Sequence, residues 1–175
     1  MMGMIAAGAG VAVAGLLGYA ASRPSAFTIT RSTKINAPPD KIFPHINDFR
    51  NWSAWSPWEK LDPQLRRTHS GQPAGKGAVY EWEGNKKVGT GRMDIVDSTP
   101  PTRVEIRLEF IKPWKAVNTT TLSLSPQGQA TDVTWSMNGT NPFMMKVMGV
   151  FMNMDELVGK DFEKGLADLK KISES

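Results

Sequence analysis

The chain of 175 residues contains no cysteine and only two histidines, His45 and His69. Without cysteine it forms no disulfide, holds no metal through thiolates and has no cysteine nucleophile. The histidines fall in different predicted elements, and no group of His, Asp and Glu has the spacing of metal ligands. The sequence therefore predicts no metal and no other cofactor. It also offers no catalytic constellation, so we interpret the protein as a non-enzyme while keeping catalysis as an alternative.

Long runs of like charge are also missing. The formal net charge is +4, and lysine and arginine are scattered in ones and twos rather than in blocks of five or six. A nucleic-acid-binding surface would need a basic stripe with interleaved aromatic residues. The pattern instead indicates a mildly basic, solvated surface and no nucleic-acid partner.

The first 22 residues contain no charged side chain. At about 1.5 Å per residue they could just cross a hydrocarbon core of about 30 Å, although Ala and Gly make them only weakly hydrophobic. We interpret residues 1–23 as an apolar segment that anchors the protein in a membrane by a single pass, with residues 1–22 as the membrane contact. A cleaved export signal, which would give an exported soluble protein, and a disordered or interfacial tail are the alternatives. The basic residues that follow favour a cytoplasmic domain by the positive-inside tendency.

The rest of the chain has the pattern of an α+β domain. Alternating apolar residues predict a strand over residues 27–36, and Pro39 opens a short helix that Pro44 limits. Six further strand-like runs, separated by turn signals, predict an antiparallel meander over residues 64–70, 77–83, 88–96, 103–111, 116–125 and 131–139. Apolar residues then recur every three or four positions to the C-terminus. They predict one long amphipathic helix with Asn141 as its N-cap.

The hairpin turns predict which residues share a face of the sheet. A four-residue loop GNKK at 84–87 would place Trp82 opposite Gly89 and Tyr80 opposite Gly91. Continuing the register gathers the apolar residues on one face: Tyr80, Trp82, Met93, Ile95, Val104, Ile106, Leu108, Phe110, Leu122, Leu124, Val133, Trp135 and Met137. The other face collects charged residues. We therefore expect a sheet with one buried face and one face exposed to solvent.

The inner face also receives polar groups. Asn118 and Thr120 face inward and need either partners or a wet cavity, and Arg31 interrupts the inner face of the first strand. Five methionines crowd residues 142–154, and thioether side chains adapt to ligands of variable shape. A solid core and an apolar cavity between sheet and helix both remain compatible with these residues.

Four segments carry a resemblance to a known family. They are STKINAPPDKIFPHINDFRNWSAWSPW at 32–58, YEWEGNKKVGTGRMDIVDSTPPTRVEIRLEF at 80–110, TDVTWSMNG at 131–139 and MDELVGKDFEKGLADLKK at 154–171. With them the chain from Phe27 to the C-terminus resembles the polyketide cyclase/dehydrase branch of the START-like, or SRPBCC, superfamily. INAPPDKIF followed by a Trp-Ser-Pro-Trp turn is the most specific part.

The resemblance implies a helix-grip fold for residues 27–175. A curved antiparallel sheet of about seven strands would wrap around a long C-terminal helix, with two short helices after the first strand and a deep apolar cavity inside. It also implies a hydrophobic ligand, because members of the family bind lipids, hormones or polyketide-like aromatics and a minority are cyclases or dehydratases. Relatives with an N-terminal membrane segment further suggest an extracytoplasmic domain.

We therefore predict a domain that binds a hydrophobic or aromatic small molecule without transforming it. A polyketide cyclase or dehydratase and an interaction module with a filled core are the alternatives, and the oligomeric state stays open. The residues expected to contact the ligand are Trp52, Trp55, Trp58, Tyr80, Trp82, Met93, Ile106, Leu108, Phe110, Asn118, Thr120, Trp135, Met148 and Phe151.

Overall fold

The computed structural model describes residues 2–175, with side chains for residue 11 and for residues 13–175. The helices in order are α1 (Met2–Ser22), α2 (Pro39–Asn47), the 3-10 helices η1 (Phe49–Ala54) and η2 (Pro57–Lys60), α3 (Phe143–Phe151) and α4 (Met154–Ser173). The strands are β1 (Ala26–Ile35), β2 (Arg66–Gly71), β3 (Ala78–Glu83), β4 (Thr90–Thr99), β5 (Arg103–Lys112), β6 (Ala116–Gln127) and β7 (Ala130–Thr140).

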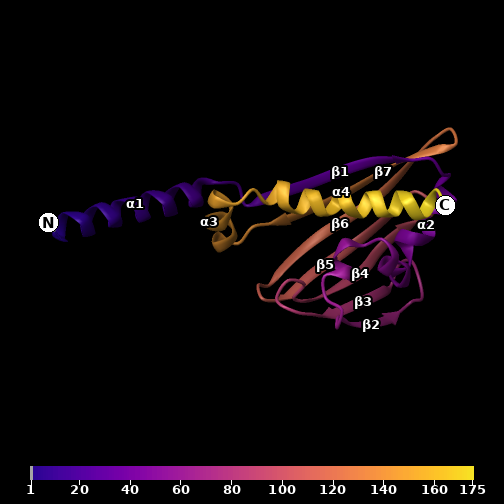
Figure 1. Ribbon diagram of the computed structural model, residues 1–175, viewed down its shortest axis with the longest axis horizontal. Helices are drawn as coiled ribbons and strands as arrows, with labels where there is room; N and C mark the ends of the chain where they lie inside the picture. The colour runs from indigo at the N-terminus through magenta and orange to yellow at the C-terminus, as the bar shows by residue number, and fades with distance from the viewer. Residues whose placement is uncertain (1) are drawn as a thin grey trace.

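The strands form one antiparallel sheet in the order β1-β7-β6-β5-β4-β3-β2. Strands β2 to β7 are a meander, and β1 pairs with β7 at the far edge, from Ala26 opposite Thr140 to Ile35 opposite Thr131. Helix α4 runs along one face of this curved sheet, and the short helices after β1 lie beside its C-terminal part (Figure 1). The predicted α+β helix-grip fold is confirmed.

Burial alternates along the strands as the sequence predicts. Tyr80 and Trp82 are buried on the inner face, whereas Arg92 pairs on the outer face with Glu81 and with Asp94. An alternation of this kind is what a sheet with one buried face requires.

The predicted hairpin register is wrong by two residues, although it places every side chain on the correct face. Trp82 lies opposite Gly91 rather than Gly89, and Tyr80 lies opposite Met93. The loop between β3 and β4 spans residues 84–89 because Gly84 N–H bonds to the carbonyl of Gly89, whose φ is +70°. A shift of two preserves the face, since the side-chain period of a strand is two.

The single C-terminal helix predicted from Asn141 is in fact two helices. α3 ends at Phe151, Met152 is extended, and the Asn153 side chain accepts a bond from the backbone N–H of Glu156 at the start of α4. Asp155 and Glu156 in the first turn favour this start because the helix dipole is positive there. Asn153, not Asn141, is therefore the cap of the long helix.

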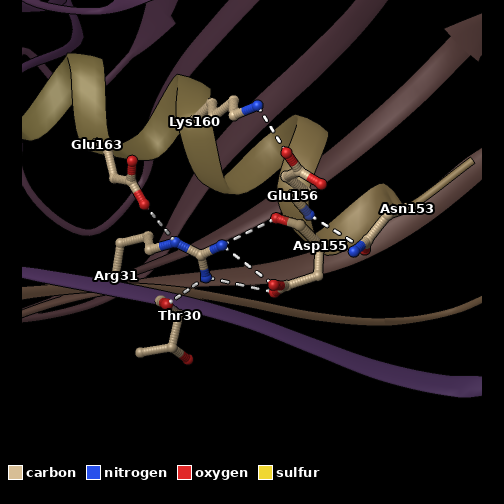
Figure 2. A network of polar contacts seen from close by, with 7 residues as sticks. All are labelled: Thr30, Arg31, Asn153, Asp155, Glu156, Lys160 and Glu163. Atoms are coloured by element: carbon tan, nitrogen blue, oxygen red, sulfur yellow. Dashed lines mark hydrogen bonds and ion pairs between the residues drawn. The ribbon is translucent and has the colours of Figure 1, made fainter.

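An arginine network ties the N-terminal part of α4 to β1, as Figure 2 shows. Arg31 pairs with Asp155 at 3.0 Å and with Glu163 at 2.8 Å, and it also donates to the backbone carbonyl of Asp155 at 3.0 Å. Gly159 makes this approach possible, because a Cβ there would lie 2.0 Å from the Nη2 atom of Arg31. Arg31 therefore fastens the helix and does not point at a ligand.

The predicted membrane anchor is corrected by the structure. Helix α1 projects away from the sheet (Figure 1), and within the described residues no helix is long and apolar enough to cross a membrane. Ala and Gly dominate residues 1–22 and contribute little apolar side-chain surface. The single-pass anchor predicted for residues 1–22 is therefore wrong, and the membrane contact and the extracytoplasmic placement lose the spanning helix on which they rested. Residue 1 and the side chains of residues 2–10 and 12 lie outside the described part.

The contact between Arg31 and Gly159 can be tested by a double substitution. Gly159→Ala adds about 1 kcal/mol of helix propensity. We expect no gain in urea stability for Gly159→Ala alone, because the new methyl group displaces the Arg31 guanidinium. In the Arg31→Ala background the same change should stabilise the protein by about 1 kcal/mol.

The matched control is Gly149→Ala in α3, where the new Cβ would lie 3.7 Å from the nearest side-chain atom, an ordinary contact. It should give the same change in both backgrounds. A gain of about 1 kcal/mol for Gly159→Ala in the otherwise unchanged protein would contradict the close contact between Arg31 and Gly159.

Candidate ligand-binding cavity

A cavity of about 550 Å³ lies between the inner face of the sheet and the N-terminal part of α4. Its volume falls within the range of about 300–1,000 Å³ typical of small-molecule sites. Apolar and aromatic side chains from β1, β3 to β7, the short helices and α4 provide most of the wall. The interior is therefore not the solid core that the sequence left open.

One end of the cavity is closed by an aromatic cluster made of Trp52, Trp55, Trp58, Trp135 and Phe162. Trp135 is its centre: its ring stacks on Phe162 at 4.3 Å between centroids and meets the other three tryptophans edge-on within 6.2 Å. Helix α4 comes this close because it carries Gly165, where a Cβ would lie 2.8 Å from the Trp135 ring.

Two of the three tryptophans that follow α2, Trp52 and Trp55, are held by that helix. The Nε1 atoms of Trp52 and Trp55 donate to the carbonyls of Ile46 and His45 at 3.2 and 2.9 Å, at the end of α2. These bonds satisfy both indole N–H groups and two carbonyls at a helix end. The short helices η1 and η2 thus carry large rings into the closed end.

Most of the predicted ligand-contact residues meet at this cavity. The cavity is lined by Trp52, Trp58, Tyr80, Trp82, Met93, Leu108, Phe110, Asn118, Thr120 and Trp135. Trp55 and Ile106 are fully buried and pack behind the wall without lining it. Met148 and Phe151 are exposed on α3, because the break before α4 separates that segment from the sheet. Ligand contact stays a prediction for all of them.

Other lining residues were not predicted. Phe27 and Glu59 line the cavity, and so do Met154, Val158 and Asp161 of α4. The α4 residues recur at four and three positions, which is the spacing of one helix face. That spacing could have identified them once the start of α4 at Asn153 was recognised.

Two buried polar atoms on lining residues have no hydrogen-bond partner among the described residues. They are the side-chain oxygen of Asn118, a residue 6% exposed, and the indole nitrogen of Trp135, which is 2% exposed. Gly139 leaves room for the amide, since a Cβ there would lie 2.0 Å from Asn118 Oδ1. Buried polar atoms are normally paired. An acceptor and a donor therefore lie unpaired in the cavity wall, each covered by neighbouring groups.

A second polar feature is the group of Glu59, Tyr80 and Arg67. The Tyr80 hydroxyl donates to one carboxylate oxygen of Glu59, and Arg67 Nε donates to the other at 2.6 Å. Burial, and then the bond to Glu59, raise the pKa of Tyr80 above its ordinary value of 10.0. The phenol therefore stays neutral, and the Glu59 charge is neutralised by Arg67.

The remaining titratable candidates are Asp161 and His45. Burial raises the pKa of Asp161, which lines the cavity, while Lys164 opposes the shift. Burial and then Lys41 lower the pKa of His45, but His45 does not line the cavity. Within the described part of the chain no cluster of three His, Asp or Glu residues could hold a metal ion.

The comparisons with known proteins agree with this geometry. Residues 26–174 match the family described as "Polyketide cyclase / dehydrase and lipid transport". The chain therefore belongs to that family, within the START-like superfamily. No curated protein matches it.

Solved structures share the fold at low sequence identity. Protein CV1439 from Chromobacterium violaceum is 16% identical, with a TM-score of 0.62 over 85% of this chain and 97% of that one. The Aha1 dimer from Colwellia psychrerythraea is 14% identical, with a TM-score of 0.61 over 85% and 96%. The di-domain ARO/CYC BexL from the BE-7585A biosynthetic pathway is 12% identical, with a TM-score of 0.61 over 89% and 52%. Family and fold together indicate hydrophobic ligand binding or cyclase-type activity.

The unpaired amide of Asn118 gives a stability prediction. Asn118→Leu replaces a buried, unsatisfied polar group by an apolar one of similar size, so we expect the unliganded protein to gain about 1 kcal/mol in urea unfolding. The control is Thr131→Val, which removes a buried bond of 2.8 Å to the Ala37 carbonyl and should lose about 1 kcal/mol. Equal losses in both variants would mean that the Asn118 amide is already paired.

The raised pKa of Tyr80 gives a pH prediction. A group whose folded-state pKa is raised contributes stability that is complete below the unfolded pKa and is lost as pH rises. Tyr80→Phe should therefore cost about 1 kcal/mol at pH 7, and the difference from the unchanged protein should shrink above about pH 10. Urea unfolding of both proteins at pH 7 and at several pH values above about 10 measures this difference in the free energy of unfolding. Tyr19→Phe, at a residue that is 57% exposed, is the control and should change stability at neither pH.

Proposed function

We propose that residues 27–175 form a domain that binds a hydrophobic or aromatic small molecule, lipid-like or polyketide-like, and does not transform it. The cavity of about 550 Å³, walled mainly by apolar side chains, is the observation that carries this proposal. Burial of a ligand there gains about 25 cal/mol per Å² of apolar surface removed from water.

The unpartnered atoms of Asn118 and Trp135 support a ligand with a hydrogen-bonding group on its apolar body. A hydroxyl group of a ligand could donate to the oxygen of Asn118, and a hydroxyl or carbonyl oxygen could accept from the indole N–H of Trp135. Arg31 is not available to orient a ligand, because Asp155 and Glu163 pair with its guanidinium. The polar contacts proposed for the ligand at Asn118 and Trp135 are thus neutral.

The scarcity of free carboxylates and histidines in the wall favours binding over catalysis. Glu59 is engaged by Tyr80 and Arg67, Asp155 is engaged by Arg31, and His45 lies away from the cavity. A filled-core interaction module would have no space of ligand size.

A cyclase or dehydratase remains the second candidate because of one residue. Asp161 lines the cavity, and burial raises the pKa of its carboxyl, as a general acid or base requires. Turnover of a polyketide mimic that is abolished by Asp161→Asn would favour catalysis over simple binding.

Filling the cavity tests the binding proposal. N-phenyl-1-naphthylamine is a neutral aromatic probe whose fluorescence rises in apolar surroundings. Leu108→Trp places a larger side chain on a lining position of β5, and we expect it to weaken probe binding by at least about tenfold, since 1.4 kcal/mol of lost contact suffices.

The matched control is Thr119→Trp, which introduces the same ring at an exposed position of the neighbouring strand β6. It should bind the probe as the unchanged protein does. No binding by the unchanged protein, or equal binding by both variants, would contradict the proposal.

A further inference from the structure

Four lysines line the cavity from one end of the sheet. Lys86 and Lys87 belong to the loop between β3 and β4, and Lys112 and Lys115 flank the turn between β5 and β6. The two loops touch, because a Cβ on Gly89 would lie 2.4 Å from the carbonyl oxygen of Lys112. All four lysines are exposed, so their ammonium groups form a lysine rim at the mouth.

The lysine rim carries charge that the described side chains leave unbalanced. None of the ion pairs between them includes Lys86, Lys87, Lys112 or Lys115. The acidic lining residues are mostly engaged elsewhere: Glu59 by Arg67 and Asp155 by Arg31.

Asp161 is the remaining lining carboxylate, and it lies on α4, across the cavity from the sheet. It is a single negative charge against four positive ones. Cations concentrated beside an apolar recess raise the local concentration of anions. The mouth therefore favours a negatively charged group.

Apolar surface adjoins the lysine rim directly. Trp114, between Lys112 and Lys115, also lines the cavity and is 62% exposed. An exposed indole beside ammonium groups suits the part of a molecule where an apolar body ends and a charged group begins.

We propose that the cavity takes an anionic amphiphile, a deepening that rests on the proposed binding function. The apolar body of the ligand lies in the cavity, and its carboxylate, sulfate or phosphate group meets the lysine rim. Lysine suits this role because its ammonium group is a point charge on a flexible stem and adapts to head groups of different shape.

Displacement of N-phenyl-1-naphthylamine from the full chain measures the preference for charge. The probes are decanoate, 1-decanol and acetate, each below any micelle-forming concentration. We expect decanoate to bind about tenfold more tightly than 1-decanol at low salt, since several exposed ion pairs each add a modest contribution. The ratio should fall towards one at about 0.5 M NaCl, where such charges are screened. Acetate, which lacks the apolar body, should not displace the probe.

A charge-matched pair of variants separates the lysine rim from net charge. The triple variant Lys86→Gln, Lys87→Gln, Lys115→Gln should lose the preference for decanoate and bind 1-decanol as before. The control triple variant Lys34→Gln, Lys76→Gln, Lys171→Gln changes exposed lysines outside the lining and should keep the preference.

The outcomes distinguish the two proposals. Equal binding of decanoate and 1-decanol by the unchanged protein overturns the anionic ligand and leaves hydrophobic binding in place. Loss of the preference in both triple variants, or displacement by acetate alone, also overturns the lysine rim as a head-group site. If neither decanoate nor 1-decanol displaces the bound probe, the anionic amphiphile is overturned, while binding of the probe itself still supports hydrophobic binding; if the probe does not bind either, both proposals fail.

Discussion

The packing of Trp135 against helix α4 is the contact on which the rest of the domain depends. Trp135 lies on β7, and its ring stacks on Phe162. The indoles of Trp52, Trp55 and Trp58, from the segment after α2, pack edge-on against it. Gly165 lacks the methyl group that would push the helix away from the Trp135 ring. Aromatic pairs of this geometry contribute about 0.5–1.5 kcal/mol each beyond the area that they bury. The large rings therefore fix the spacing of helix and sheet at one end.

The same arrangement explains why the interior is hollow rather than filled. The bulkiest side chains are used at the closed end, while Gly89 on the sheet and the first turns of α4 line another part of the cavity. Trp82 covers Gly91 so closely that a Cβ there would lie 2.3 Å from its ring. Asn118 is buried beside the cavity, and its side-chain oxygen has no partner among the described residues.

The faces of the strands could be predicted from the sequence, but the lengths of the loops could not. The alternation of Tyr80, Trp82 and Met93 fixes a side of the sheet, because it depends only on a period of two. The exact partners depend on where Gly89 adopts a positive φ, and GNKKVG fits a loop of four residues as well as one of six.

The break between α3 and α4 could not be predicted from the apolar pattern either. Apolar periodicity continues through Phe151 and Met154, so it hides the interruption. The local signal is Asn153 followed by Asp155 and Glu156, an N-cap with acids in the first turn. Because the predicted helix runs through this interruption, the predicted site includes Met148 and Phe151. The ion pairs of Arg31 were equally hidden, since its partners lie more than 120 positions away in the sequence.

Helix α4 is held to the rest of the domain by two kinds of force that respond differently to salt. Phe162 and Leu166 are held by apolar packing, which salts excluded from the protein surface strengthen. The pairs of Arg31 with Asp155 and Glu163 are partly exposed, and dissolved ions screen them. High salt therefore leaves the helix on its apolar contacts while it weakens the ionic link to β1.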